Sequence, residues 1–481
     1  MNALPQDELV AMLGQWRLDR GPLWQRLGNR VITLVDEGAL PDDAPLPTER
    51  ALAELLGVSR STTTAAYRHV RQSGRLHSRQ GSGSRTRRPP GATRSRPVED
   101  GAFSTLGRSP AGVIDLSLAE ARCDHHTRAA IDDLDPGWLT AGVRDTGYHP
   151  QGLPALRLAL AEQLGLGGPE QILVTTGAQQ AIALTASVLC PPGSTVLVEE
   201  ASYPGALEVF RRLGARVLPV PTDRHGPEPQ ALAALAERTR PRLVYLVPVG
   251  NNPTGVIVPG HRLDALADAL ARSGSVLLED RTAVPLADPD DVPAALSARL
   301  PAGTAVTVGS MSKVAWAGLR TGWVVAAPGL LRELLAARIA TDLAGSAISQ
   351  LLATRLVPRL PELAAAVRGE LAVSRRALRA ALAEQLPEWS APEPAAGAWQ
   401  WVRIPADARL FTRAAAAEGV LVTPGPLFSP QALLTDRLRL ATVEPAEVLV
   451  EAVGRLRRAW ESVQHAPSAS TRDDGRDLLL I

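Results

Sequence analysis

The feature that most constrains this fold is an alternation of short β-rich runs with helical runs, which extends over residues 113–464. Because parallel neighbours need a long crossover connection, strands that alternate with helices favour a mostly parallel sheet covered by helices on both faces. The β-rich runs are ILVTT (172–176), TVLVEE (195–200), RLVYLVP (242–248), SVLLED (275–280), TAVTVGS (304–310) and GWVVAA (322–327). The sequence therefore predicts an α/β fold for this part of the chain.

A smaller α+β part is expected to complete the same region. Residues 344–384 are rich in Ala, Leu and Arg and predict helix, and strands are expected near 398–404 and 437–443. A last helix is predicted near 444–463. The predicted domain therefore spans residues 113–464, and a disordered tail is expected over 465–481.

The first 86 residues have a different pattern, in which short helices precede a hairpin. Helices are predicted over Pro22–Glu37, over Glu49–Leu56, and from Ser59 to about Gln72. Thr48 and Ser59 are placed to cap the second and third of these helices, and Gly57 to end the second. A hairpin follows, with its tip at residues 80–83. Residues 87–112 contain RRPPGATRSRP and predict an extended linker, so the first domain is expected to span residues 1–86.

Composition excludes several classes of protein. The 481 residues carry 51 basic and 50 acidic side chains, so any attraction to nucleic acid must be local. No apolar run approaches the ~20 residues of a membrane span, and the first ten residues do not form a secretion signal. Two distant cysteines and no spacing typical of metal ligands predict a reduced, cytoplasmic protein without a metal or a membrane partner.

The third predicted helix suits the recognition of double-stranded DNA. A capped helix, a glycine turn and a second capped helix form a helix-turn-helix pattern, whose second helix enters the major groove. Its first residues offer hydroxyl groups and a guanidinium to phosphates and base edges, namely Ser59, Arg60, Ser61, Thr62 and Thr63. A small helical dimerisation domain with a solvated polar face is the alternative interpretation.

One count bears on the chemistry of the larger domain. Of the 51 basic residues only Lys313 is a lysine, and arginine cannot form a Schiff base as lysine does. Lys313 follows a predicted strand in Ser310-Met311-Ser312-Lys313, with Arg320 shortly after it. Three further polar patterns also lie at the carboxyl ends of predicted strands: Thr176-Gly177-Ala178-Gln179, Asn252-Pro253-Thr254-Gly255 and Glu279-Asp280. These groups match the needs of a phosphorylated aldehyde bound at the carboxyl edge of the sheet.

The N-terminal segment LPTERALAELLGVSRSTTTAAYRHVRQSGRLHSRQGSGS resembles the winged helix-turn-helix domain of the GntR family of bacterial regulators. The similarity covers about residues 20–86. It implies DNA contacts from the third helix and from two further regions, with Gln80 and Gly81 at the minor groove. The implied DNA-binding residues are Arg50, Ser59, Arg60, Ser61, Thr62, Thr63, Gln80 and Gly81.

The motifs TGAQQ, NNPTG, ED, SMSK and GLRTG, in this order, resemble those of the fold-type I aminotransferases across about residues 113–464. This similarity implies that Lys313 carries pyridoxal 5′-phosphate (PLP) as a Schiff base, that Asp280 pairs with the pyridine nitrogen, and that Asn252 binds the ring hydroxyl. It also implies that Tyr203 stacks on the ring. The implied phosphate ligands are Gly177, Ala178, Gln179, Ser310, Ser312 and Arg320.

The same similarity assigns two residues to the ligand and to a second subunit. Arg439 matches the arginine that grips a substrate carboxylate, and Tyr148 matches a residue that reaches the neighbouring subunit's cofactor, which implies a homodimer. One position departs from the family pattern. Thr282 stands where many relatives have a tyrosine that binds the ring hydroxyl, so efficient transamination is in doubt while cofactor binding is expected to survive.

A GntR-type reader joined by a linker to an aminotransferase-like domain resembles the MocR subfamily of regulators. The resemblance implies a transcriptional regulator that senses PLP itself, an amine or an amino acid through the Schiff base at Lys313. A working aminotransferase with an appended DNA-binding module is one alternative. A constitutive DNA-binding protein whose large domain only dimerises is another. The sequence does not specify the effector, the operator or the direction of regulation.

Overall fold

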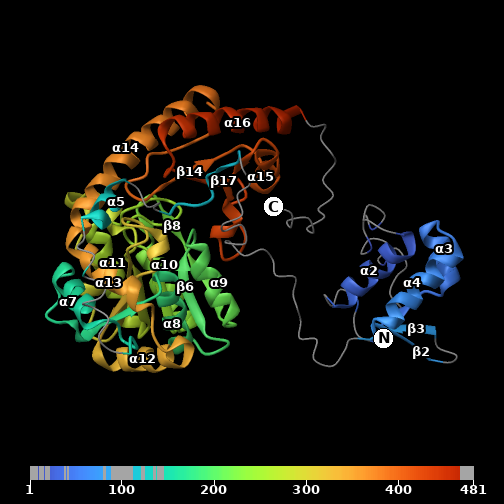
Figure 1. Cartoon of the computed structure of the whole chain (residues 1–481), viewed down its shortest axis with the longest axis horizontal. Helices are drawn as coiled ribbons and strands as arrows, with labels where there is room; N and C mark the ends of the chain where they lie inside the picture. Colours follow the sequence, from blue (N-terminus) through green and yellow to red (C-terminus); the bar gives the residue numbers. More distant parts are fainter. Residues whose placement is uncertain are drawn as a thin grey trace. The chain divides into compact units, whose positions relative to one another are not determined.

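The computed structural model describes residues 22–36, 40, 43–79, 83–87, 112–120, 125–133 and 146–465, with the single positions 9, 13, 16 and 137. The chain divides into two compact units between Gly101 and Ala102, which is inside the linker predicted over 87–112. Most of that linker and the tail expected over 465–481 lie outside the described residues. Each unit is drawn in Figure 1 and is described here by itself.

The small unit contains three described helices and a three-stranded sheet. Thr48 and Ser59 cap the second and third helices as predicted, because their side-chain oxygens accept hydrogen bonds from the amides of Ala51 and Thr62, both at 3.2 Å. Gly57 ends the second helix with φ +58°, a conformation that favours glycine. The elements are α2 (Leu23–Asp36), β1 (Pro45–Leu46), α3 (Glu49–Leu56), α4 (Arg60–Gln72), β2 (Leu76–Arg79) and β3 (Gly83–Thr86), with strand order β1-β3-β2.

Helix α4 is amphipathic, and its apolar side forms part of the core of the small unit. Ala66, Tyr67 and Val70 are buried against α2, and the Tyr67 hydroxyl donates to the carbonyl oxygen of Pro47 at 2.8 Å. The opposite side leaves Arg60 and other polar side chains exposed. The predicted helix-turn-helix is therefore present, with one polar surface left free on its second helix.

The large unit is built on a seven-stranded sheet with the order β5-β13-β12-β11-β10-β6-β7. Six of these strands point in the same direction, and β13 runs antiparallel to both of its neighbours, so the sheet is mixed and mostly parallel. The strands are β5 (Ile172–Thr175), β6 (Thr195–Glu199), β7 (Arg216–Val220), β10 (Leu243–Leu246), β11 (Val276–Asp280), β12 (Ala305–Ser310) and β13 (Gly322–Ala326). The sequence analysis missed β7, whose Pro219 is tolerated because the strand lies at the sheet edge.

Helices cover both faces of this sheet, as the α/β pattern predicts (Figure 1). Side chains of each strand alternate between two cores: Val196 and Val198 pack with α8, α9 and α12, whereas Leu197 packs with α10 and α11. The helices are α7 (Pro154–Gln163), α8 (Ala178–Leu189), α9 (Pro204–Arg212), α10 (Pro229–Thr239), α11 (Gly260–Ser273) and α12 (Pro328–Asp342). A two-residue hairpin pairs β8 (Thr222–Asp223) with β9 (Gly226–Pro227).

The C-terminal part is α+β, as expected, and it includes the segment that follows the linker. Its elements are α13 (Ala347–Leu356), α14 (Leu360–Gln385), β14 (Trp399–Arg403), α15 (Ala408–Ala417), β15 (Val420–Leu421), β16 (Thr423–Pro424), β17 (Arg437–Ala441) and α16 (Ala446–His465). Strand β4 (Ile114–Asp115) pairs with β15 in parallel, and α5 (His125–Asp132) contacts α14. The helical run predicted over 344–384 is divided at a 3₁₀ turn that contains Pro358. No helix of the described residues is long and apolar enough to cross a membrane.

Candidate functional site

A cavity of about 460 Å³ lies at one edge of the large sheet. Because β5, β6, β10, β11 and β12 point in the same direction, the segments that follow them meet at this edge, where the antiparallel β13 begins. Eight of the residues proposed from the sequence line the cavity: Ala178, Gln179, Tyr203, Asn252, Asp280, Ser312, Lys313 and Arg320.

One end of the cavity is shaped to receive an anion. Gly177 caps α8 with φ +80°, and a Cβ atom at this position would lie 2.9 Å from a guanidinium nitrogen of Arg320. Arg320 donates to the carbonyl oxygen of Thr176 at 2.8 Å and is itself in the left-handed region with φ +50°, a conformation that is strained in an arginine. The helix N-terminus and the guanidinium therefore face the same space, which suits a phosphate.

Two serines stand beside this anion-binding end. Ser310 Oγ donates to Ser312 Oγ at 3.0 Å and accepts from the amide of Ser312 at 3.2 Å. Ser312 lines the cavity, whereas Ser310 is buried below it. Ser312 is thus positioned to contact a ligand, and Ser310 supports it.

Asp280 is a buried carboxylate at the end of β11 and is 4% exposed. It accepts hydrogen bonds from the Tyr245 hydroxyl at 2.8 Å and from the Thr282 amide and hydroxyl at 2.9 and 2.6 Å. Burial raises the pKa of Tyr245, so this phenol remains a donor. Thr282, which replaces the expected tyrosine, therefore points its hydroxyl at Asp280 and helps to fix the carboxylate that faces the cavity.

Arg439 lies on β17 and is 8% exposed. It donates to Asn252 Oδ1 at 3.2 Å, to the carbonyl oxygen of Ser117 and to Thr423 Oγ1, and burial lowers its pKa to about 10. None of these partners is a carboxylate, and Arg439 Nε has no hydrogen-bond partner among the described residues. A buried guanidinium with spare donors suits a ligand carboxylate.

Tyr203 and Gln179 form one wall of the cavity. Tyr203 precedes α9, and desolvation raises its pKa, so the ring is neutral. Gln179 Nε2 donates to the carbonyl oxygen of Gly205 at 2.9 Å, whereas its buried Oε1 has no partner among the described residues. The anion-binding end and Asp280 together fit a phosphorylated pyridine ring.

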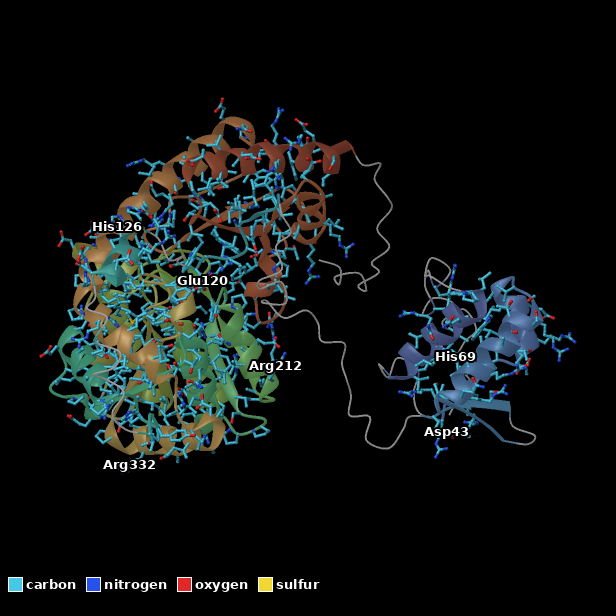
Figure 2. All side chains as sticks on the ribbon, viewed as in Figure 1. Asp43, His69, Glu120, His126, Arg212 and Arg332 are labelled. Carbon is cyan, nitrogen blue, oxygen red and sulfur yellow. The ribbon has the colours of Figure 1, made fainter. Side chains whose placement is uncertain are left out.

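Lys313 is 11% exposed, and two residues that the sequence analysis missed hold its ammonium. Lys313 Nζ donates to the carbonyl oxygen of Ala119 and to Glu120 Oε1, both at 2.8 Å, and it lies 5.6 Å from the centroid of the Trp399 ring. No local pattern marks Glu120 in the sequence, because it meets Lys313 only through the fold. Figure 2 labels Glu120 in the body of the large unit.

Two other predictions concern the outside of the large unit. Tyr148 is 67% exposed and does not line the cavity of its own chain. The sequence assigned no metal, but the fold brings His125 and His126 of α5 next to Glu370 of α14, with one potential ligand atom from each within 4.8 Å of the others. These three side chains are all partly or fully exposed, with His126 labelled in Figure 2.

In the small unit, the proposed DNA-binding residues at the start of α4 are accessible to solvent, except for Thr63. Arg60 and Ser61 are exposed, and Arg50 is exposed while it pairs with Glu54 at 3.1 Å. Thr63 is fully buried, and its hydroxyl donates to the backbone oxygen of Glu49 at 2.8 Å, so its assignment as a DNA contact was wrong. The helical period turns Thr63 inward, three residues before Ala66. Ser59 is exposed, Thr62 is partly exposed, and Gln80 and Gly81 lie outside the described residues.

Comparisons with known families agree with the two-unit organisation. The family of class I and II aminotransferases matches residues 112–456, and the gntR family of bacterial regulatory proteins matches residues 23–85. The HTH-type transcriptional regulator TauR of Rhodobacter capsulatus is 27% identical over 92% of this chain and 97% of its own length. Both units therefore have counterparts in a single regulator.

Two further relatives resemble the large unit alone. A 2-aminoadipate transaminase of Thermus thermophilus is 34% identical over 66% of this chain and 82% of its own length. The solved structure of LysN, an alpha-aminoadipate aminotransferase from Thermus thermophilus complexed with N-(5'-phosphopyridoxyl)-L-leucine, is 30% identical. It superimposes with a TM-score of 0.68 over 74% of this chain and 93% of that chain.

Proposed function

The chain belongs to the family of class I and II aminotransferases, with PLP as its cofactor, and carries a GntR-type DNA-binding domain as in the MocR subfamily; from this premise we propose that it is a transcriptional regulator that senses PLP, an amine or an amino acid. One observation carries the proposal: the sole lysine of the chain lines a cavity together with Asp280 and Arg320.

We assign different residues of the cavity to different parts of the cofactor. When bound, PLP supplies an aldehyde that reacts with primary amines. Lys313 offers the only side-chain amine of the protein, and Asp280 offers a fixed carboxylate to a ring nitrogen. The start of α8, Ser312 and Arg320 would hold the phosphate, with Gly177 and Ser310 supporting them. Tyr203 would stack on the ring, and Asn252 would bind its hydroxyl. Arg439 receives the carboxylate of an amino-acid effector.

The DNA-binding half of the proposal rests on the exposed side of α4. Arg60 and Ser61 occupy the first turn of this helix, where side chains reach base edges and phosphates in the major groove. Two such helices are needed to read a two-fold symmetric site, so we expect a homodimer in which Tyr148 approaches the partner's cavity. A regulator of this kind acts on the chromosome and is expected in the cytoplasm.

A spectral titration with matched variants tests the sensing half. Adding PLP to the full-length protein should produce an absorbance band near the visible edge, and borohydride reduction should leave the added mass at position 313. Lys313→Arg keeps the positive charge but cannot bond to the aldehyde, so this variant should lose both signals, as should Lys313→Ala. A band or a trapped mass that persists in either variant would refute the assignment.

A second measurement connects the cavity to DNA. Amines and amino acids are added to the PLP-loaded protein, and the affinity for an operator fragment is measured by gel shift. We expect at least one of these ligands, or PLP itself, to change the affinity in the wild type and to have no effect in Lys313→Arg. An operator affinity that no ligand changes would favour a constitutive DNA-binding protein.

The alternative is an active aminotransferase with an appended reader domain. Its support is the 34% identity with a 2-aminoadipate transaminase. Thr282 weighs against it, because its hydroxyl bonds to Asp280 at 2.6 Å and cannot serve the ring hydroxyl at the same time. Sustained turnover of an amino acid with an α-keto acid, lost in Lys313→Arg, would establish the enzyme.

A further inference from the structure

One short segment contacts both cations that the proposed function assigns to ligands. We call residues 112–120 the N-terminal strap. The carbonyl oxygen of Ser117 accepts from Arg439, and two residues further on Ala119 and Glu120 hold Lys313. The strap therefore hydrogen-bonds to both the cofactor amine and the candidate carboxylate-binding guanidinium.

The strap is held in place by backbone hydrogen bonds on both sides. The amides of Ile114 and Leu116 donate to the carbonyl oxygens of Gly419 and Leu421 at 2.9 and 2.8 Å, and the amide of Ala441 donates to Leu116 at 2.8 Å. Past Leu116, the hydrogen bonds to other parts of the chain go mainly to Lys313 and to Arg439 and Thr423. Ala119 is in addition buried against Trp399 and Ala441. The two cations thus supply most of the long-range polar contacts of this end of the strap.

The three groups around the Lys313 ammonium form a complete binding site for a cation. A carboxylate and a backbone carbonyl accept hydrogen bonds from two of its N–H groups, and the face of Trp399 lies within the range of a cation–π contact. With a side chain 11% exposed, Lys313 has little water to replace these partners. An amine held in this way must leave Glu120 before its nitrogen can attack an aldehyde.

We propose, on the basis of the proposed function, that Glu120 is the positioning residue of the cofactor amine. With the carbonyl oxygen of Ala119 it holds the free Lys313 ammonium at the strap. When Lys313 gives up a proton to solvent and condenses with the aldehyde of PLP, a carbon–nitrogen bond forms and the aldehyde oxygen leaves as water. Lys313 then no longer bonds to Glu120, and the end of the strap is released. The strap continues through residues 88–111 to the wing strand β3, so it is the connection between the cavity and the DNA-binding unit along the chain.

Acetylation of the sole lysine tests whether Glu120 and Ala119 hold Lys313 when no cofactor is present. The cofactor-free protein is treated with acetic anhydride, and acetylation at position 313 is followed by peptide mass spectrometry. Glu120→Gln removes the charge and keeps the size, so we expect acetylation several-fold faster than in the wild type, whereas Glu120→Asp should restore much of the protection. Glu370→Gln is the matched control, because Glu370 lines the neighbouring cavity without bonding to Lys313.

Deuterium exchange tests the release of the strap. In the wild type, saturating PLP should increase exchange at the amides of residues 117–120, and Glu120→Gln should show increased exchange there without PLP. Circular dichroism confirms that each variant is folded. If Glu120→Gln matches the wild type in both acetylation and exchange, or if PLP protects these amides, the proposal is wrong.

The two proposals fail in different ways. Absence of the PLP band and of the trapped mass at position 313 would remove the proposed function, whatever the acetylation rates show. A normal PLP band together with equal acetylation rates in Glu120→Gln, Glu370→Gln and the wild type would remove the role of Glu120 alone.

Discussion

The exposed side of α4 and the cavity of the large sheet differ in where their candidate binding residues come from and in how far these residues are exposed. On α4 the candidate contacts come from consecutive residues at the start of one helix, and most are exposed to solvent. In the cavity they come from the ends of several strands, and Asp280 in its wall and Arg439 behind Asn252 are almost fully buried. All the buried charged side chains of the described residues belong to the large unit.

This difference predicts different consequences of substitution. An exposed side chain that loses its ligand is still solvated, so its removal costs only the contact itself. A buried charge depends on its partners, because water cannot replace them. Substitutions in the cavity should therefore have larger effects that spread to neighbouring groups, and substitutions on α4 smaller and more independent ones.

The largest effect is expected at Arg439. Arg439→Ala removes the buried guanidinium that bonds to Asn252 of the cavity wall, and we expect the affinity for a carboxylated amine to fall by ~2–5 kcal/mol while PLP still binds. Spectral titration with an amino acid and with the corresponding amine that lacks the carboxylate distinguishes loss of the carboxylate contact from loss of PLP binding. Arg437→Ala, two residues earlier on β17 and paired with Asp436, is the matched control and should bind both normally. Loss of PLP binding in Arg439→Ala would place this arginine at the cofactor instead.

The next effect concerns pH and a buried carboxyl group that has no counterpart among the described residues of the small unit. Burial raises the pKa of Glu199 from 4.5 to about 8, although its carboxylate accepts from the amide of Val247. Since the folded state binds this proton more tightly than the unfolded state, the stability it contributes is present below pH 4.5 and is lost as pH rises through 8.

The free energy of unfolding should therefore decrease between pH 5 and pH 8, with a limiting slope of about 1.4 kcal/mol per pH unit. Glu199→Gln cannot ionise and should have a flatter profile, as measured by chemical denaturation at each pH. Parallel profiles for the wild type and Glu199→Gln would show that Glu199 is ionised throughout.

A smaller effect is expected for Arg60 on α4. Arg60→Ala should weaken operator binding by ~1–3 kcal/mol if Arg60 makes a bidentate contact to a base. The measurement is a gel-shift titration, with Arg332→Ala, an exposed arginine of the large unit, as the control. Unchanged affinity would remove Arg60 from the set of DNA contacts. A loss accompanied by a reduced salt dependence would indicate a phosphate contact instead.

The smallest effect is expected at Thr63, where the sequence-based assignment was wrong. Thr63→Val leaves the backbone oxygen of Glu49 without its donor and should lower the free energy of unfolding of the small unit by about 1 kcal/mol. Thermal unfolding of the full chain measures this loss. Operator affinity well below the melting temperature should remain that of the wild type. A specific loss of affinity at full folding would restore Thr63 as a contact.

Local patterns predicted the elements of the fold well. Thr48, Gly57 and Ser59 each act within a few residues, so capping rules located α3 and α4 correctly. The β-rich runs predicted six strands of the large sheet for the same reason. Strand β7 was missed because a proline usually argues against a strand, and only its place at the sheet edge makes Pro219 acceptable.

The cavity was predictable in part. Asp280, Asn252 and Lys313 each follow a strand, and the direction of parallel strands brings such residues to one edge. Glu120 and the group His125, His126 and Glu370 follow no such rule, because their partners lie far away in the chain. The orientation of the Thr282 hydroxyl likewise depends on the position of Asp280 after folding.

The sequence by itself determined which chemistry this protein carries: one amine among 51 cations, a capped reader helix, and polar residues at the ends of strands. Tertiary structure alone decided which groups become partners of the two cations. The strap brings the Glu120 carboxylate to Lys313 and the Ser117 carbonyl oxygen to Arg439. The physical reason is the separation along the chain over which each interaction acts. Capping and strand patterns act between neighbours in the chain, whereas the strength of an ion pair is set by distance and burial, which exist only after the chain has folded.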